Sequence, residues 1–330
     1  MSKFNQIREF IKTEFNNLMF DIEFLNQVNI DLLKNCTKDI DLPFYNYSRY
    51  EYENEYFKIT ESNNFSLIIK KNNQVVGLWY LMLIQVNGTP KLYSLGVDES
   101  VSQPFFFNLS KTNKSKLIDL TLNLLIILKK KFNLKEINIS EHTHNNKLSK
   151  WGRELSKLCN QSQINIIYIS DTSNKNKEVM DNIIKNNKNF INIDYSNKEL
   201  DKLWTQFQEL HKKKTGKLTR STDSWEIQKK MIINQEASLY GYIDKSNLLA
   251  GIFIYYSKSV AYYSVGVLGQ VSSINDKLFK FASACLKKIK IEKLILGIQN
   301  TNIEEKKYIQ IHVSNKHRSD YQEPLLMFTL

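Results

Sequence analysis

The sequence predicts an α+β protein made of two similar domains in tandem. The pentapeptide at 93–97 (YSLGV) returns at 263–267 (YSVGV), 170 residues later in a chain of 330. Around each copy the residue pattern indicates the same order of elements: a hairpin and a further strand, a loop, a lysine-flanked apolar helix and a short strand. An ordered series repeated in this way indicates duplicated domains, and the chain length suits about two of them.

The elements expected in the first copy follow from apolar periodicity and from turn residues. Polar residues at 71–74 predict a first turn, and Asn87-Gly88 is typical of a tight hairpin. In order, the expected elements are one or two amphipathic helices within 3–34, strands at 65–69, 75–86 and 91–97, a helix at 116–132, a strand at 136–140, a helix at 148–158 and a strand at 164–169.

A tyrosine-rich stretch, residues 45–56, precedes the first strand. One interpretation is an aromatic loop or a short helix that packs on the sheet. The other is a surface that stacks against a ligand. Tyrosine suits both, because its ring is apolar and its hydroxyl forms hydrogen bonds.

A polar stretch with a helical core, residues 171–192, connects the two copies. The elements expected after it are an amphipathic helix at 200–210, a second β-β-β-α-β series with its helix at 277–290 and its last strand at 293–297, a strand at 308–313, a polar loop at 314–323 and a final strand after Pro324. We therefore expect a first domain over 1–172, a helical linker over 173–197 and a second domain over 198–330.

The composition is basic, with 46 Lys and Arg against 34 Asp and Glu and a formal charge of +12. Positive charge favours anionic partners such as phosphates, nucleotides, RNA or an acidic membrane surface. The richness in Lys, Asn and Ile, as an AT-rich genome would produce, explains the same charge without a partner. Clustering of the charges is what would identify a binding surface.

The three cysteines, Cys36, Cys159 and Cys285, are odd in number and far apart, which predicts free thiols in a reducing compartment. No run reaches the roughly 18 apolar residues of a membrane helix. The N-terminus lacks the unbroken apolar stretch of a signal peptide. We therefore expect a cytoplasmic protein, and the sequence leaves its oligomeric state open.

The order of antiparallel strands, helix, strand and further α-β pair resembles the GNAT acyltransferase fold. Two such domains bridged by a basic helical stretch resemble the Fem-type aminoacyl and peptidyl transferases and the GNAT-like acyltransferases of bacterial glycan pathways. The segments that carry the resemblance are the helix at 179–191, the helix at 203–210 with its His-Lys turn at 211–216, the paired tyrosines at 262–264 and the Gly-ended strand at 294–297.

The resemblance implies two tandem GNAT-like domains, each with a mostly antiparallel mixed sheet and flanking helices. It implies an acyltransferase that moves an acyl or aminoacyl group onto an amine or hydroxyl of an amino sugar or a cell-envelope or glycan precursor. The donor would be an acyl-CoA or an aminoacyl-tRNA, tRNA would be a partner in the second case, and no metal is expected. The phosphate-binding glycine pattern of GNAT proteins follows neither pentapeptide. That departure leaves open a non-catalytic GNAT-like binding or scaffold protein.

The donor is assigned to the second domain because a compact turn of small residues precedes its helix. Backbone N–H groups at a helix N-terminus bind phosphate, and small side chains allow the close approach. The expected donor-binding residues are Gly266, Gly269, Ser272 and Ser273. The corresponding link of the first domain, residues 98–114, is long and bulky, so it is expected to shape the acceptor pocket with Gln103.

His211 and Tyr263 are the candidate catalytic residues. An imidazole takes up a proton near neutral pH, and a phenol returns one to a leaving group. The alternative for His211 is a helix C-terminal cap among lysines. The alternative for Tyr263 is a core position, since alternate residues of a strand face the interior.

Arg220, Asp223 and Trp225 follow the His-Lys turn and are candidates for substrate binding, as is Lys316 in the basic C-terminal loop. A solvated loop, with Asp223 or Ser224 as the cap of the next helix, explains the first three nearly as well. A further pair of histidines, at 142 and 144, is compatible with a metal site or with a surface turn. No third ligand lies near them in the sequence.

Overall fold

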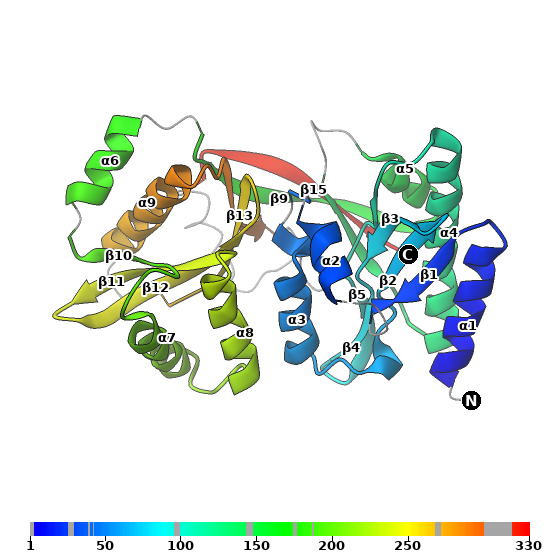
Figure 1. Ribbon diagram of the computed structural model, residues 1–330, viewed down its shortest axis with the longest axis horizontal. Helices are drawn as coiled ribbons and strands as arrows, with labels where there is room; N and C mark the ends of the chain where they lie inside the picture. Colours follow the sequence, from blue (N-terminus) through cyan, green and yellow to red (C-terminus); the bar gives the residue numbers. More distant parts are fainter. Residues whose placement is uncertain are drawn as a thin grey trace. The chain divides into compact units, whose positions relative to one another are not determined.

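The computed structural model describes residues 3–25, 30–38, 40–41, 43–95, 100–142, 148–173, 177–186, 188–267, 272–299 and 319–330 (Figure 1). The chain forms two compact units. Unit 1 contains residues 1–37, 57–165 and 324–330, and unit 2 contains residues 38–56 and 166–323. Each unit is described by itself.

Unit 1 combines helices with short antiparallel sheets. Its elements are α1 (Lys3–Asn16), β1 (Asp21–Phe24), α2 (Ile30–Thr37), η3 (Glu61–Asn63), β2 (Leu67–Lys71), β3 (Gln74–Trp79), β4 (Met82–Val86), β5 (Thr89–Tyr93), β6 (Val101–Ser102), β7 (Phe105–Phe106), α4 (Lys111–Phe132), β8 (Asn138–His142), α5 (Lys150–Ser156), the first part of β9 (Gln161–Asp171) and most of β15 (Tyr321–Thr329). Strands β1, β2, β3 and β7 form one sheet in that order, β4 pairs with β5, and β8 lies between β15 and β6.

The N-terminal region has two helices, one of the alternatives expected within 3–34, and also a strand that periodicity did not predict. A strand, β1, separates the two helices and pairs antiparallel with β2. Met19 has a left-handed φ of 64°, where α1 has ended, and Phe20 and Phe24 are fully buried. The segment therefore adds a strand to the sheet, because alternate apolar residues bury their side chains there.

The run at 75–86, expected as one strand, is two. The chain leaves the β3 ladder at Tyr80 and begins β4 at Met82, which pairs with β5 and, through a single bridge, with Asn64. The Leu81 N–H donates to the Ser66 hydroxyl (2.8 Å). The expected turn at 71–74 is confirmed by left-handed Asn72 and Asn73, and the turn at Asn87-Gly88 by φ angles of 50° and 76°.

Helix α4 begins earlier than the 116–132 expected, because Ser110 caps it by accepting from the Asn113 N–H. Its buried face supplies much of the unit 1 core. Thr121 on that face accepts a hydrogen bond from the Trp151 indole (3.1 Å). This contact ties α4 to the neighbouring α5.

Glu141 of β8 is a fully buried carboxyl in unit 1. One of its oxygens accepts from the Ser149 N–H (2.7 Å), and the other, Oε2, has no hydrogen-bond partner among the described residues. Burial raises the pKa of this carboxyl, against the opposing effect of Ser149. A Cβ placed on Gly152 would lie 1.6 Å from Oε2, so only glycine fits there.

Unit 2 is one mostly antiparallel sheet covered by helices on both faces. Its elements are η2 (Pro43–Tyr45), α3 (Tyr47–Tyr56), the rest of β9, α6 (Lys177–Asn186), β10 (Phe190–Ile193), α7 (Leu200–Thr215), α8 (Thr222–Ile233), β11 (Ala237–Asp244), β12 (Asn247–Tyr256), β13 (Val260–Val267), α9 (Ser272–Lys288), β14 (Lys293–Gln299) and the start of β15. The strand order is β10-β11-β12-β13-β14-β9, and only β13 and β14 run parallel. Helices α7 and α8 lie on one face, and α6 and α9 on the other (Figure 1).

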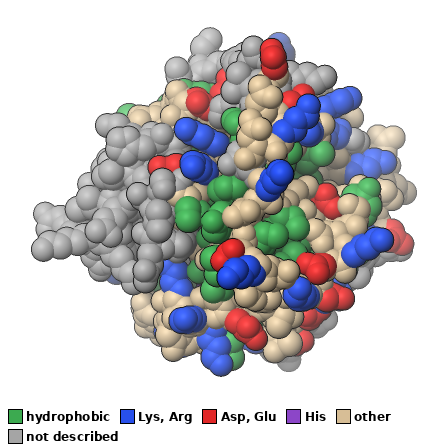
Figure 2. Space-filling view, turned by 90° about the vertical axis from the view of Figure 1, so that its left-hand side faces the viewer, with side chains coloured by type: hydrophobic (Ala, Val, Ile, Leu, Met, Phe, Trp, Pro, Cys, Tyr) green, Lys and Arg blue, Asp and Glu red, His purple; other side chains and the backbone are tan. Residues whose placement is uncertain are grey.

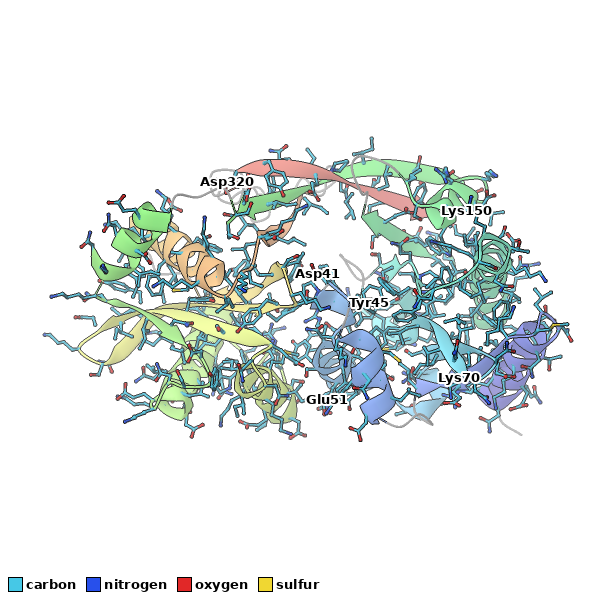
Figure 3. The ribbon with its side chains drawn as sticks, turned by 45° about the horizontal axis from the view of Figure 1, so that its top comes forward. Asp41, Tyr45, Glu51, Lys70, Lys150 and Asp320 are labelled. Atoms are coloured by element: carbon cyan, nitrogen blue, oxygen red, sulfur yellow. The ribbon has the colours of Figure 1, made fainter. Side chains whose placement is uncertain are left out.

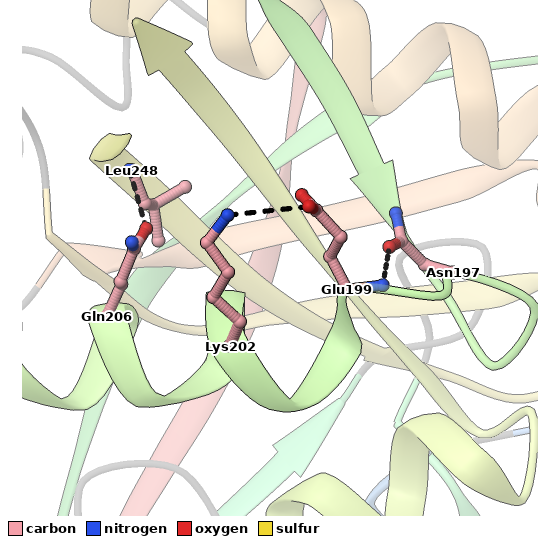
Figure 4. A network of polar contacts seen from close by, with 5 residues as sticks. All are labelled: Asn197, Glu199, Lys202, Gln206 and Leu248. Carbon is pink, nitrogen blue, oxygen red and sulfur yellow. Dashed lines mark hydrogen bonds and ion pairs between the residues drawn. The ribbon is translucent and has the colours of Figure 1, made fainter. Parts of the chain in front are cut away.

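Two hydrophobic clusters fill the faces of the unit 2 sheet. The α7 face holds Trp204, Phe207, Trp225 and Phe253 with neighbouring aliphatic residues. The α9 face holds Tyr240, Phe281 and their neighbours. Helix α7 has the apolar spacing that the sequence predicted (Figure 4). Just before it the Glu199 N–H donates to Asn197, and in its second turn Gln206 accepts from the Leu248 N–H of β12 (2.8 Å).

An early segment of the chain, residues 38–56, belongs to unit 2. Asp41 anchors it at the loop before β13, where its carboxylate accepts from the hydroxyls of Ser257 and Ser259 (Figure 3). These hydrogen bonds lower the pKa of Asp41, although its partial burial acts in the opposite direction. The tyrosine-rich stretch forms η2 and α3, which agrees with the short-helix interpretation, and α3 packs against α8.

The domain bounds expected from the sequence are contiguous, whereas the two units are not. Residues 38–56 are grouped with unit 2 and residues 324–330 with unit 1. The segment expected as a linker forms α6 and β10, and β10 pairs with β11 at the edge of the unit 2 sheet. Folding of this segment onto unit 2 follows from the apolar residues that α6 and β10 carry toward α9.

We expect Gly152→Ala to lower the free energy of unfolding of unit 1 by about 1–3 kcal/mol, since a methyl group forced into a filled interior shifts its neighbours. Urea titration followed by tryptophan fluorescence measures the change. In a Glu141→Ala background the same substitution should cost less than about 1 kcal/mol, because the colliding carboxyl is gone. An equal cost in both backgrounds would contradict this account of Gly152.

Candidate functional site

Strands β13 and β14 of unit 2 pair at one end and then diverge. Their parallel pairing covers Val260 to Tyr262 on β13 and Lys293 to Ile295 on β14. On its other side β14 pairs with β9 from Lys293 to Gln299, and beyond Tyr262 β13 keeps only β12 as a partner in the described part of the chain. The edge of β13 from Ser264 to Val267 therefore offers backbone groups that no described strand satisfies.

A β-bulge marks the point of divergence. Phe253 lies opposite Val265 and Ile254 lies opposite Tyr263, so Ser264 is the extra residue on β13. A bulge bends its strand and leaves one residue outside the ladder, and bulges are frequent beside active sites. The bulge also places Tyr263 and Gly266 on the same face of the sheet.

Tyr263 is held in place at this divergence. Its ring packs edge-on against Phe279 of α9, with 5.1 Å between ring centroids. A Cβ on Gly266 would lie 2.5 Å from the Tyr263 hydroxyl oxygen, so the hydroxyl sits directly over the Gly266 backbone. Tyr263 is partly buried and packs against the hydrophobic cluster on the α9 face, which agrees with the core position weighed as the alternative for it.

The remaining expected donor residues border the start of α9. Gly269 lies outside the described residues. Ser272 is the first residue of α9 and Ser273 the second, and only their helical backbone is described.

His211 lies within α7, on the stripe of residues that faces the core. The buried positions of this helix are Leu200, Leu203, Trp204, Phe207 and His211, at helical spacing. The C-cap is Gly216, whose N–H donates to the Lys212 carbonyl, so the capping role considered for His211 is wrong.

Arg220, in the loop between α7 and α8, is fixed by three neighbours. Its Nε donates to the Tyr52 hydroxyl (2.7 Å) and its Nη1 to His211 Nε2 (3.1 Å). Its guanidinium lies over the Trp225 ring, 4.9 Å from the centroid, and the His211 ring meets the same indole edge-on. We call Arg220, His211, Tyr52 and Trp225 the Arg220 cluster.

The Arg220 guanidinium, together with burial, determines the tautomer and the charge of His211. A guanidinium has only donors, so His211 Nε2 must be the acceptor and its proton must lie on Nδ1. Burial lowers the pKa of His211 to about 4, and the charges of Arg220 and Lys214 contribute in the same direction. The imidazole is therefore neutral at physiological pH, and its lone pair is used to hold Arg220.

One edge of Arg220 remains available to a ligand. Its third nitrogen, Nη2, has no partner among the described residues, and the side chain is partly exposed. Three lysines end α7 just before this loop: Lys212, Lys213 and Lys214. A rigid arginine beside several lysines is a suitable site for phosphate or carboxylate.

Sequence reasoning missed Tyr52, which α3 brings to the Arg220 cluster. Arg49 of the same helix forms an ion pair with Glu53 and lies over the Tyr52 ring (5.2 Å). Burial raises the pKa of Tyr52, while the two arginines act to lower it. No local signal links Tyr52 to Arg220, since 168 positions separate them.

The other expected site residues lie elsewhere. Asp223 is exposed in the first turn of α8, whose cap is Ser221, so the expectation that Asp223 or Ser224 caps this helix is wrong. Gln103 lies between β6 and β7 of unit 1 and is partly buried. Lys316, His144 and the side chain of His142 lie outside the described residues.

Three further observations, on cysteines, metal sites and membrane-spanning helices, apply to all of the described residues. All three cysteines are free. No group of three or more His, Cys, Asp or Glu side chains is arranged to hold a metal within the described ranges. No described helix combines the length and apolarity needed to cross a bilayer.

The low pKa of His211 predicts a pH dependence of unit 2 stability. An unfolded histidine binds a proton near pH 6.5, whereas folded His211 does so near pH 4, so stability falls as pH decreases from 6.5 toward 4. His211→Gln keeps an acceptor for Arg220 and removes the titration. Between pH 7 and pH 5 the wild type should lose about 2 kcal/mol more than this variant, measured by urea unfolding. Parallel curves for the two proteins would refute the assignment of a neutral, buried His211.

The sequence matches no protein-family model and shows no significant similarity to a curated protein. Solved structures nevertheless share its fold. A structure of FemX matches with a TM-score of 0.57 at 13% identity, covering 92% of this chain and 96% of that one. The C-terminal DUF2156 domain of a putative lysylphosphatidylglycerol synthetase from Agrobacterium fabrum matches with a TM-score of 0.55 at 8% identity, covering 91% and 90%.

A tandem GNAT protein from the clavulanic acid biosynthesis pathway, solved without AcCoA, matches with a TM-score of 0.50 at 10% identity and covers 91% of this chain and 93% of that one. At these identities the likeness concerns the fold. The expected α+β class and the tandem GNAT-like architecture are confirmed: the chain has a tandem GNAT fold.

Proposed function

We propose that this protein is an acyltransferase and that unit 2 binds the acyl donor where β13 and β14 diverge. The observation that carries the proposal is the bulge at Ser264, followed by a strand edge without a described partner and then by the start of α9. Such an edge pairs with an extended ligand as it would with a strand. The helix N-terminus adds backbone donors for an anionic group.

The donor we propose is an acyl-CoA or an aminoacyl-tRNA, both of which present an extended chain beside phosphate. Gly266 and Gly269 let the backbone approach the donor, and Ser272 and Ser273 stand at the first turn of α9. A helix N-terminus contributes only about 0.3–1 kcal/mol per anion, so cationic side chains must add to it. Arg220 is our candidate, because three contacts have already fixed its orientation.

The proposed reaction transfers an acyl or aminoacyl group to an amine or hydroxyl. The acceptor nitrogen or oxygen attacks the acyl carbonyl carbon, a new C–N or C–O bond forms, and the C–S bond to CoA or the ester C–O bond to tRNA breaks. The acceptor loses a proton and the leaving group gains one. We propose that the Tyr263 hydroxyl, which lies over Gly266 at the divergence, donates the proton that the leaving group gains.

The role we propose for His211 is to position Arg220. Its Nε2 lone pair already accepts from the guanidinium, so action as the catalytic base would require that contact to break. The acceptor we propose is an amino sugar or a cell-envelope or glycan precursor in the cytoplasm. Gln103, Asp223 and Lys316 remain proposed contacts for it, and the GNAT fold supports the reaction class more than the identity of this acceptor.

Calorimetric titration of the purified protein with acetyl-CoA and with longer acyl-CoAs tests the donor. We expect binding to at least one of them, and Gly266→Ala should weaken it at least tenfold, about 1.4 kcal/mol, because the added methyl displaces the Tyr263 hydroxyl. Gly88→Ala, in an open turn of unit 1, is the matched control and should leave donor affinity unchanged. A donor affinity that Gly266→Ala leaves unchanged would refute the proposed donor site.

If the acyl donor is an aminoacyl-tRNA, a different binding behaviour is expected. Contacts with phosphates release counterions, so tRNA affinity should fall steeply between about 50 and 200 mM salt. Arg220→Ala should lower both the affinity and the slope of its salt dependence, whereas Asp223→Asn should lower neither. A protein that binds neither acyl-CoA nor tRNA is better described as a non-catalytic GNAT-like binding or scaffold protein.

A further inference from the structure

Unit 2 contains a cavity of about 420 Å³ at the other end of β13. The start of β11, the end of β12, the turn after β10 and the C-terminal half of α9 form its walls. Ser257, which lines it, donates its N–H to the Val260 carbonyl at the start of β13, whereas the divergence begins at Tyr263, roughly 10 Å further along the strand. A cavity of this size holds a small molecule, and the proposed donor site does not include it.

Neutral hydrogen-bonding side chains line much of this cavity. They are Asn46, Asn192, Gln235, Ser238, Tyr240 and Tyr256. Tyr256 donates its hydroxyl proton to the Ala237 carbonyl (3.2 Å), so its oxygen remains an acceptor. The Asn192 carbonyl oxygen is buried and has no hydrogen-bond partner among the described residues. Such a wall suits a ligand with several hydroxyl groups.

Two carboxylates, Asp194 and Glu236, complete the wall. Asp194 accepts from the Asn192 amide (2.9 Å) and from the backbone N–H (2.9 Å) and hydroxyl (2.6 Å) of Ser196. These donors are neutral, and no ion pair to Asp194 is found among the described residues. The Asp194 charge also acts on other groups of the wall: burial raises the pKa of Cys285 to about 12, and this carboxylate contributes to the increase.

The cations of the cavity lie toward solvent. Lys38 is exposed, and Lys258 stands in the loop between β12 and β13. Tyr240, by contrast, is 1% exposed, and the electrostatic influence of Asp194 reaches its hydroxyl. The cavity wall therefore combines two exposed lysines with the Asp194 carboxylate, which is bonded only to neutral donors among the described residues, and this carboxylate favours a bound cation.

We propose that this cavity binds a small polyhydroxylated molecule that carries a protonated amine, of about monosaccharide size. The ammonium group donates to Asp194 and Glu236, and the hydroxyls bond to the neutral side chains. No covalent step takes place there. This inference rests on the cavity alone and does not depend on the acyl-transfer proposal.

Three matched sugars test the recognition of the amine. Glucosamine, N-acetylglucosamine and glucose have similar rings, but only glucosamine carries the charge. By saturation-transfer NMR and calorimetry, we expect glucosamine to bind with a Kd below about 10 mM and the other two at least tenfold more weakly. Binding of glucosamine should also weaken as pH rises through the pKa of its amine. Equal affinity for the three sugars, or no binding of glucosamine, would overturn the proposal.

Asp194→Asn removes the charge and keeps the side-chain shape. The fold should tolerate it, since Asn192 can present its unused carbonyl oxygen to the new amide after rotation. We expect glucosamine affinity to fall at least tenfold, with the same result for Glu236→Gln. Glu209→Gln makes an equal charge change on the exposed face of α7 and should leave affinity unchanged. An affinity in Asp194→Asn equal to that of the wild type would exclude Asp194 as the ammonium partner.

The three free thiols give an internal control for the location. Cys285 lines the cavity, whereas Cys36 and Cys159 belong to unit 1. Glucosamine should slow modification of Cys285 by iodoacetamide and leave the rates at the other two unchanged, as followed by peptide mass spectrometry over long incubation at a pH below the pKa of the glucosamine amine, where the ligand keeps its charge. A bound sugar that protects none of the thiols, or all three equally, would place the site elsewhere.

Discussion

The divergence of β13 from β14 is the constraint on which the arrangement of unit 2 depends. A parallel pair that stops after three residues leaves an edge of β13 unpaired by any described strand, and unpaired backbone groups must bond to something. The bulge at Ser264 makes this possible, because it bends the strand while β12 continues to hold its other edge. Helix α9 begins at Ser272, five residues after β13 ends, so the next backbone donors along the chain are those of a helix N-terminus.

The Arg220 cluster is built from several separate segments of unit 2. The loop that carries Arg220 is oriented from three directions, by α7 through His211, by α8 through Trp225 and by α3 through Tyr52. Each contact restricts the guanidinium before any ligand arrives, which reduces the entropy lost on binding. A fragment that begins at residue 198 lacks α3, and with it the acceptor for the Arg220 Nε.

Patterns within a few residues of one another were predicted well from the sequence. Asn-Gly at 87–88 and the polar turn at 71–74 specify hairpins through left-handed backbone, and the apolar spacing over 200–210 predicts α7, although this helix continues to Thr215 and buries His211. The strand β1 was missed because its apolar residues also fit helical spacing, and pairing with β2 decides the outcome. The contact of Tyr52 with Arg220 and the cavity around Asp194 each join distant segments, which no local pattern encodes.

The structure shows where the charged side chains of the described residues lie. On the face shown in Figure 2, Lys and Arg alternate with Asp and Glu around hydrophobic side chains, so a formal charge of +12 does not produce one basic patch there. The lysines at the end of α7 do lie together, beside an arginine whose orientation is fixed. At the opposite end of β13 the cavity is lined by carboxylates and phenols. Unit 2 thus groups cationic side chains around Arg220 and carboxylates at the cavity beside the start of β13, and these two places favour ligands of opposite charge.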